Sequence, residues 1–169
     1  MEPRSSQNVL IVDDEESIRD VIIMNMDGID ANFLQADSGL EALKVIAKFE
    51  VAVIVCDITM PEMTGIQLLA HLRAEGNTTP FIVHTGFGST NHNLQALRLG
   101  AFDFVEKPFK PELMRSLILE ALKLSKAIKI LNSQMNSSLE DAGFSVTPQL
   151  RQAVASVLAL KAIRVKESA

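Results

Sequence analysis

The stretch Val51-Ala52-Val53-Ile54-Val55-Cys56-Asp57 decides the fold. Its apolar residues, most of them β-branched, run without interruption and end in one carboxylate. Such a run is typical of a strand that is buried on both faces of a parallel sheet. Asp57 therefore lies where this strand is expected to leave the core. Because ligands of open α/β sheets bind beyond the carboxyl ends of the strands, the residues that follow the other strands are the next to consider.

Polar residues follow three further predicted strands. The run 9–12 leads into Asp13 and Asp14, the run 80–84 into Thr85, and the run 102–106 into Lys107. A shorter strand is predicted over residues 33–36. Apolar residues at helical spacing predict helices over 17–27, 40–49, 66–74 and 89–100, and from residue 112 onward. Alternation of strands and helices predicts an α/β fold with a doubly wound parallel sheet.

Four separated motifs at these spacings resemble the receiver (CheY-like) domain of two-component response regulators. They are Asp13-Asp14, Asp57 with Met60-Pro61 and Gly65, Thr85-Gly86, and Lys107-Pro108. The resemblance covers residues 8–125. It implies a flavodoxin-like, five-stranded sheet in the order 2-1-3-4-5. It also implies a function in a phosphorelay, in which Asp57 accepts a phosphoryl group from a histidine kinase.

The resemblance implies a role for each polar group. Asp14, Asp57 and the backbone carbonyl of Thr59 would bind Mg²⁺, and Asp13 would contact the ion through water. Converging carboxylates repel one another, and a hard divalent cation with oxygen ligands relieves that repulsion. Lys107 would share the charge of the transferring oxygens. We therefore expect a phosphoacceptor with Mg²⁺-dependent autophosphorylation and autodephosphorylation, rather than a conventional metabolic enzyme.

The same resemblance implies a switch. Thr85 would bind a phosphate oxygen through its hydroxyl, and Phe104 would rotate into the space that Thr85 leaves. Because Phe104 has no phenolic hydroxyl, packing alone must distinguish its two rotamers. The face formed by residues 89–106 and the helix from Glu112 would then change its protein partners. Thr59 and Phe87 offer no carboxylate or amide to orient water, so we expect slow dephosphorylation.

Composition limits the other possibilities. A net charge of −5 without a Lys/Arg run argues against direct nucleic-acid binding. No signal segment or membrane span is apparent, and we expect a cytoplasmic protein. Cys56 is the one cysteine, which excludes an intramolecular disulfide. His71, His84 and His92 share no metal-ligand spacing, and we expect them to be hydrogen-bonded or solvated rather than ligands.

The ends of the chain extend beyond the receiver. Residues 1–7 are expected to be disordered, and residues 126–169 to form a helical extension. Leu124, Ile128, Leu131 and Met135 continue an apolar stripe on the last receiver helix, and Thr147-Pro148 would begin a second helix. We expect the stripe to pair two copies of the chain into a homodimer. The alternatives are back-folding of the second helix as a cap, and a disordered tail.

Three other functions compete with this interpretation. A haloacid-dehalogenase-like phosphohydrolase needs a second Asp two residues after Asp57, where this chain has Thr59. A flavodoxin-like cofactor binder lacks its phosphate loop here, because acidic residues follow the first strand. The stronger alternative is a receiver fragment of a DNA-binding transcriptional regulator, whose output is reduced or supplied by a partner. Only about 44 residues follow Ser125, fewer than a usual winged-helix output domain needs.

Overall fold

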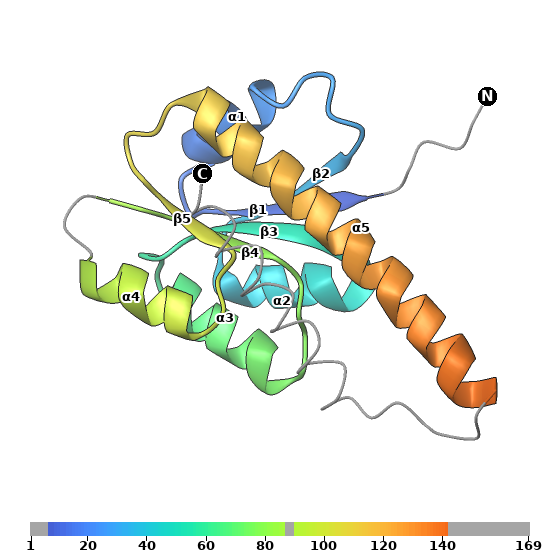
Figure 1. Ribbon diagram of the computed structural model, residues 1–169. Coiled ribbons are helices and arrows are strands. Elements are labelled where there is room, and N and C mark those ends of the chain that lie inside the picture. The colour runs from blue at the N-terminus through green and yellow to red at the C-terminus, as the bar shows by residue number, and fades with distance from the viewer. Residues whose placement is uncertain (1–6, 87–89, 142–169) are drawn as a thin grey trace.

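Strand β3 (Val51–Asp57) is the middle strand of a five-stranded sheet in the computed structural model (Figure 1). The structure describes residues 7–86 and 90–141. All strand pairs are parallel, and their order is β2-β1-β3-β4-β5. This confirms the α/β fold and the strand order that the receiver resemblance implies.

Strands and helices alternate along the described chain. The other strands are β1 (Asn8–Val12), β2 (Asn32–Ala36), β4 (Phe81–Thr85) and β5 (Asp103–Glu106). The helices are α1 (Glu16–Met24), α2 (Gly39–Lys48), α3 (Gly65–Ala74), α4 (Thr90–Arg98) and α5 (Pro111–Asp141). The helix expected over residues 17–27 ends earlier, at Met24. Asn25 ends it there, because its side-chain amide donates to the Val21 carbonyl at 2.7 Å.

Helices cover both faces of the sheet, with α1 and α5 on one face and α2, α3 and α4 on the other (Figure 1). Each face has its own core. Val9 and Ile11 of β1 pack with Ile22 of α1 on one side, and Leu10 packs with Leu68 of α3 on the other. Burial on both faces explains why β1, β3 and β4 read as continuous apolar runs.

The loop after β3 is fixed by close backbone contact. The Gly65 amide donates to the Ile58 carbonyl at 2.9 Å. A Cβ at Gly65 would lie 2.2 Å from the Asp57 carbonyl oxygen, so only glycine fits there without a shift. Thr64 and Gln67 form a reciprocal capping box at the start of α3. This loop therefore begins a helix directly behind Asp57.

Helix α5 continues beyond Ser125 to Asp141, a total of 31 residues. Its Lys129 ammonium lies 2.7 Å from the Glu50 carboxylate, at the edge of the sheet where β3 begins. Ile128 is buried and lines a groove of about 420 Å³ together with Phe49 and Val51. None of the helices in the described ranges is long and apolar enough to span a membrane. The expected second helix and the N-terminal residues 1–6 lie outside the described residues.

The predicted apolar stripe is divided in the structure. Ile128 is 9% exposed and Leu124 is half-buried, whereas Leu131 is 36% exposed. Ile130, which was not part of the stripe, is 48% exposed. The side chain of Met135 lies outside the described residues. The apolar surface that this part of α5 leaves open is therefore formed by Ile130 and Leu131.

Candidate functional site

The carboxyl edge of the sheet brings together side chains from four strand ends. Asp13 follows β1, Asp57 ends β3, Thr85 ends β4 and Lys107 follows β5. Parallel pairing places these ends at one edge, since β3 is paired with both β1 and β4. Asp13, Asp57 and Thr85 are buried, and the Lys107 side chain is 19% exposed.

Both carboxylate oxygens of Asp13 accept hydrogen bonds. Its Oδ1 accepts the Glu15 amide at 2.8 Å, and its Oδ2 accepts the Lys107 ammonium at 2.9 Å. The Arg19 guanidinium donates to the Asp13 backbone carbonyl at 2.7 Å. The carboxylate is therefore fixed in position although it is fully buried.

Lys107 joins the ends of β4 and β5 to the acidic group. Its amide donates to the Thr85 carbonyl at 2.7 Å, which fixes the loop relative to β4. Burial acts to lower the pKa of the ammonium, but the hydrogen bond to Asp13 and the charge of Asp57 outweigh burial and raise that pKa. Lys107 is therefore a permanently charged group at this site.

Asp57 is the less well satisfied of the two buried acids. Its Oδ1 lies 3.5 Å from the Lys107 ammonium and has no hydrogen-bond partner in residues 7–86 and 90–141. Burial raises the pKa of this carboxyl to about 6, and the Lys107 charge opposes the rise. A buried oxygen without a hydrogen bond is costly to the fold, and such groups gather at functional sites. Asp57 thus presents a buried carboxylate oxygen whose nearest cation is the Lys107 ammonium at 3.5 Å.

Two predicted metal ligands belong to exposed residues. Asp14 and Thr59 are both exposed. The three residues whose ligand atoms all lie within 4.8 Å of one another are Asp13, Asp57 and His84. Asp14 is therefore not in the group that the ion-free geometry brings together, although it directly follows Asp13 in the chain.

The two predicted switch residues lie on neighbouring strands. The Thr85 hydroxyl donates to the Gly86 carbonyl at 3.4 Å. Phe104 of β5 is half-buried against the core on the α2, α3 and α4 face. It pairs in register with Val83, and Thr85 pairs with Glu106.

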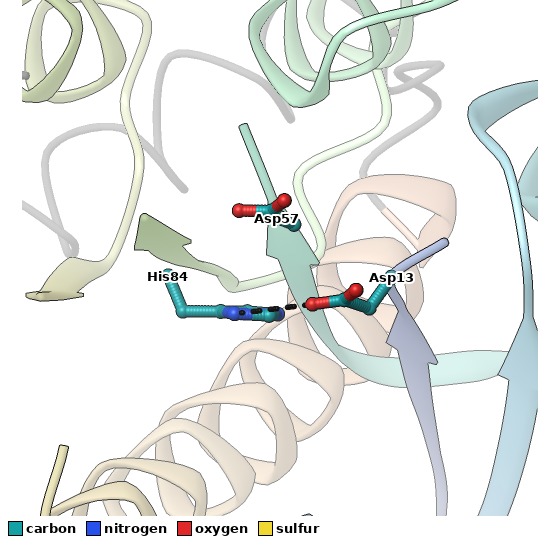
Figure 2. A group of neighbouring side chains, drawn as sticks. All are labelled: Asp13, Asp57 and His84. Carbon is teal, nitrogen blue, oxygen red and sulfur yellow. Dashed lines mark ion pairs between the residues drawn. The ribbon is translucent and has the colours of Figure 1, made fainter. Parts of the chain in front are cut away.

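His84 is the residue that the sequence interpretation missed. His84 is fully buried rather than solvated, and neither imidazole nitrogen has a hydrogen bond of good geometry among the described residues, although the Val12 backbone is a polar neighbour. Its Nδ1 lies 3.6 Å from Asp13 Oδ2, and Figure 2 shows the ring directed at that carboxylate, with Asp57 beside it. His71 is exposed, 3.4 Å from Glu75, and the side chain of His92 lies outside the described residues. The sequence does hold a signal for His84, because this polar residue directly follows the buried apolar run 81–83.

The donors at this site suit a cation. Two buried carboxylates face one ammonium, and within the described part of the chain the Asp57 Oδ1 and both His84 nitrogens lack hydrogen bonds of good geometry. Oxygen donors of this kind fit Mg²⁺.

Most of the chain matches a known protein family. Residues 9–119 match the family model of the response regulator receiver domain. The chain belongs to this family. Over 135 residues the receiver is 34% identical to the regulatory protein AtoC of Escherichia coli, which covers 77% of this chain and 29% of AtoC. It is 32% identical over 158 residues to an NtrX-like putative response regulator of Rickettsia conorii, covering 89% of this chain and 33% of that protein.

The solved receiver domain of the Francisella response regulator 1452 superposes with a TM-score of 0.65 at 31% identity, over 69% of this chain and 97% of that one. The chain spans about a third of the curated relatives described above. Members of the receiver family act in two-component signalling and generally bind Mg²⁺.

Proposed function

We propose that this receiver accepts a phosphoryl group on Asp57 from the phosphohistidine of a sensor kinase or phosphotransfer protein. The observation that carries the proposal is the buried Asp57 Oδ1, which accepts no hydrogen bond from any described residue and lies at the carboxyl edge of the sheet. An Asp57 oxygen forms a bond to phosphorus as the phosphorus–nitrogen bond breaks. The leaving imidazole keeps the electron pair and takes up a proton.

The ion that supports this reaction is proposed to be Mg²⁺. Asp57, Asp14 and the Thr59 carbonyl would hold it, and Asp13 would contact it through water. When bound, the ion neutralises the charge of the transferring oxygens. Lys107 already lies 3.5 Å from Asp57 Oδ1, so its ammonium can pair with a phosphoryl oxygen after a small movement.

The output is proposed to use the face made by α4, β5 and α5. Leu94 and Leu97 of α4 and Leu113 of α5 are large apolar residues that are exposed there. Thr85 and Lys107 are linked by a 2.7 Å backbone hydrogen bond at the edge of this face. Movement of either residue toward a phosphoryl group would therefore move the other, and Phe104 beside them would repack.

Self-association and cellular location are also proposed. A homodimer would pair Ile130 and Leu131 of α5 across two copies, because both are exposed apolar residues on the helix beyond the receiver. A cytoplasmic location and the absence of direct nucleic-acid contact are predictions from the sequence. The partners of the longer relatives are not assigned to this chain.

Phosphorylation with a small donor tests the central proposal. The protein is incubated with phosphoramidate and Mg²⁺, and intact mass is measured. We expect a gain of one phosphoryl group in the wild type and in Asp37→Asn, which changes an exposed carboxylate after β2. We expect none in Asp57→Asn or in excess EDTA. Labelling that persists in Asp57→Asn would reject Asp57 as the acceptor.

A further inference from the structure

The buried acidic group of this receiver includes a nitrogen donor. His84 is the strand-β4 partner of Asp57 in the sheet register, so its position is set by backbone pairing. The imidazole packs edge-on against the Phe109 ring, with ring centres 6.1 Å apart. The ring is therefore held between Phe109 and the Asp13 carboxylate, and Figure 2 shows it directed toward the acids.

The imidazole has a free lone pair in this position. The ring is fully buried, and its Nδ1 lies 3.6 Å from Asp13 Oδ2. A neutral imidazole has one N–H donor and one lone pair. Neither nitrogen has a hydrogen-bond partner among the described residues. Burial of a polar group without a well-formed hydrogen bond costs stability, and such groups gather at functional sites.

The spacing of the donors fits a metal ion better than a hydrogen bond. His84 Nδ1 and Asp13 Oδ2 are 3.6 Å apart, which is too long for a hydrogen bond. Two ligands that bind one tetrahedral ion at about 2.1 Å are separated by about 3.4 Å. The donor atoms of Asp13, Asp57 and His84 all lie within 4.8 Å of one another, so small side-chain movements bring all three to one ion.

We propose that His84 is a metal ligand, and that with Asp13 and Asp57 it binds a divalent transition-metal ion such as Zn²⁺ or Co²⁺. Imidazole nitrogen favours these ions, whereas Mg²⁺ is bound through oxygen. The Lys107 ammonium, 2.9 Å from Asp13 Oδ2 in the ion-free protein, leaves the carboxylates when the ion binds. Its side chain is 19% exposed and has a route to solvent.

This inference uses two carboxylates of the proposed phosphoryl site and rests on that site, but it requires no phosphoryl transfer. It predicts a second class of ion for the receiver, selected by one residue. Removal of His84 should therefore weaken the binding of Zn²⁺ and Co²⁺ and leave the binding of Mg²⁺ nearly unchanged. A loss of Zn²⁺ and Co²⁺ affinity that is larger than the loss of Mg²⁺ affinity distinguishes a direct ligand from a residue that only supports the fold.

Calorimetric titration with Co²⁺ and with Mg²⁺ measures both affinities in protein without a histidine tag. The variants are His84→Leu, which keeps an apolar side chain against Phe109, and His71→Gln, which changes the exposed histidine of α3. We expect His84→Leu to weaken Co²⁺ binding by about tenfold or more, with Mg²⁺ binding changed less than about threefold. His71→Gln should match the wild type for both ions. Unchanged Co²⁺ binding, or equal weakening for both ions, overturns the proposal.

A second measurement uses only the wild type and so does not depend on the folding of a variant. Long-range proton–nitrogen spectra report the imidazole nitrogens, and titration with Zn²⁺ should shift one His84 nitrogen resonance at one equivalent. Unshifted His84 resonances at saturating Zn²⁺ also overturn the proposal. Loss of Mg²⁺-dependent phosphorylation would instead count against Asp57 as acceptor, and the two failures are separate.

Discussion

The Lys107 ammonium lies closer to Asp13 than to Asp57. It lies 2.9 Å from Asp13 Oδ2 and 3.5 Å from Asp57 Oδ1. Asp13 is fully buried, so in the ion-free protein the lysine chiefly compensates the charge of Asp13. A phosphoryl group on Asp57 would add negative charge close to the same ammonium and draw it away. Since the Lys107 amide is bonded to Thr85, that movement is coupled to β4.

Lys107→Ala should destabilise the protein and uncouple the output face. The variant leaves the buried Asp13 carboxylate without its cation, and we expect a loss of about 1 to 3 kcal/mol in the free energy of unfolding. It should still accept phosphate on Asp57. Urea denaturation gives the first quantity, and amide exchange over α4, β5 and α5 with and without phosphoramidate gives the second.

Lys110→Ala is the matched control, because Lys110 is exposed three residues further along. It should keep both the stability and the exchange response of the wild type. An exchange response in Lys107→Ala that equals that of the wild type would contradict the coupling.

Asp57→Asn should stabilise the ion-free protein at neutral pH. The pKa of Asp57 is raised from 3.8 to about 6 in the folded state, because burial penalises the carboxylate. Well below pH 3.8 the carboxyl is protonated in both the folded and the unfolded state, and wild type and variant should be alike. As pH rises through 6 the folded state must hold the buried charge, so stability is lost. After a discount for partial solvent contact, we expect a difference of about 1 to 2 kcal/mol at pH 7.5.

Denaturation in EDTA at several values of pH between 4 and 7.5 measures this difference. Addition of Mg²⁺ at pH 7.5 should reduce it, since the ion compensates the carboxylate. A difference that is the same at pH 4.5 and pH 7.5 would show that ionisation of Asp57 is not its cause.

Gly65→Ala should disturb the site through the backbone. The added Cβ would lie 2.2 Å from the Asp57 carbonyl oxygen, so the loop after β3 must shift. We expect a loss of about 1 to 3 kcal/mol in stability together with slower phosphorylation. Gly86→Ala is the control for stability, because a Cβ there meets nothing within 4 Å. Thermal unfolding and the rate of mass gain with phosphoramidate are the two measurements, and equal melting temperatures for the two variants would contradict the close-contact argument.

The sequence predicted the sheet and most of the site for a clear reason. Strands buried on both faces give continuous apolar runs, and parallel pairing brings their final residues to one edge. Asp13, Asp57, Thr85 and Lys107 could therefore be placed together from the chain alone. His84 could not, because its contact with Asp13 depends on the β3–β4 register and on the direction of the ring. The position of Asp14 was also beyond the sequence, since the turn after β1 turns its side chain toward solvent.

The proposed dimer depends on the part of α5 beyond the receiver, and the structure changes which residues test it. Ile128 is buried in the groove with Phe49, so a charge there would disturb the chain's own packing. Ile130 and Leu131 are exposed and are the residues to change.

Burial of such a side chain across two copies is worth about 1.5 to 3 kcal/mol before the cost of association. We therefore expect sedimentation at micromolar concentration to show a dimer for the wild type and a monomer for the double variant Ile130→Glu/Leu131→Glu. Asp37→Lys, which changes the charge at an exposed position after β2, away from α5, should remain a dimer. A wild type that is monomeric both before and after phosphorylation would exclude this pairing and favour the alternative in which the predicted helix from Thr147 folds back.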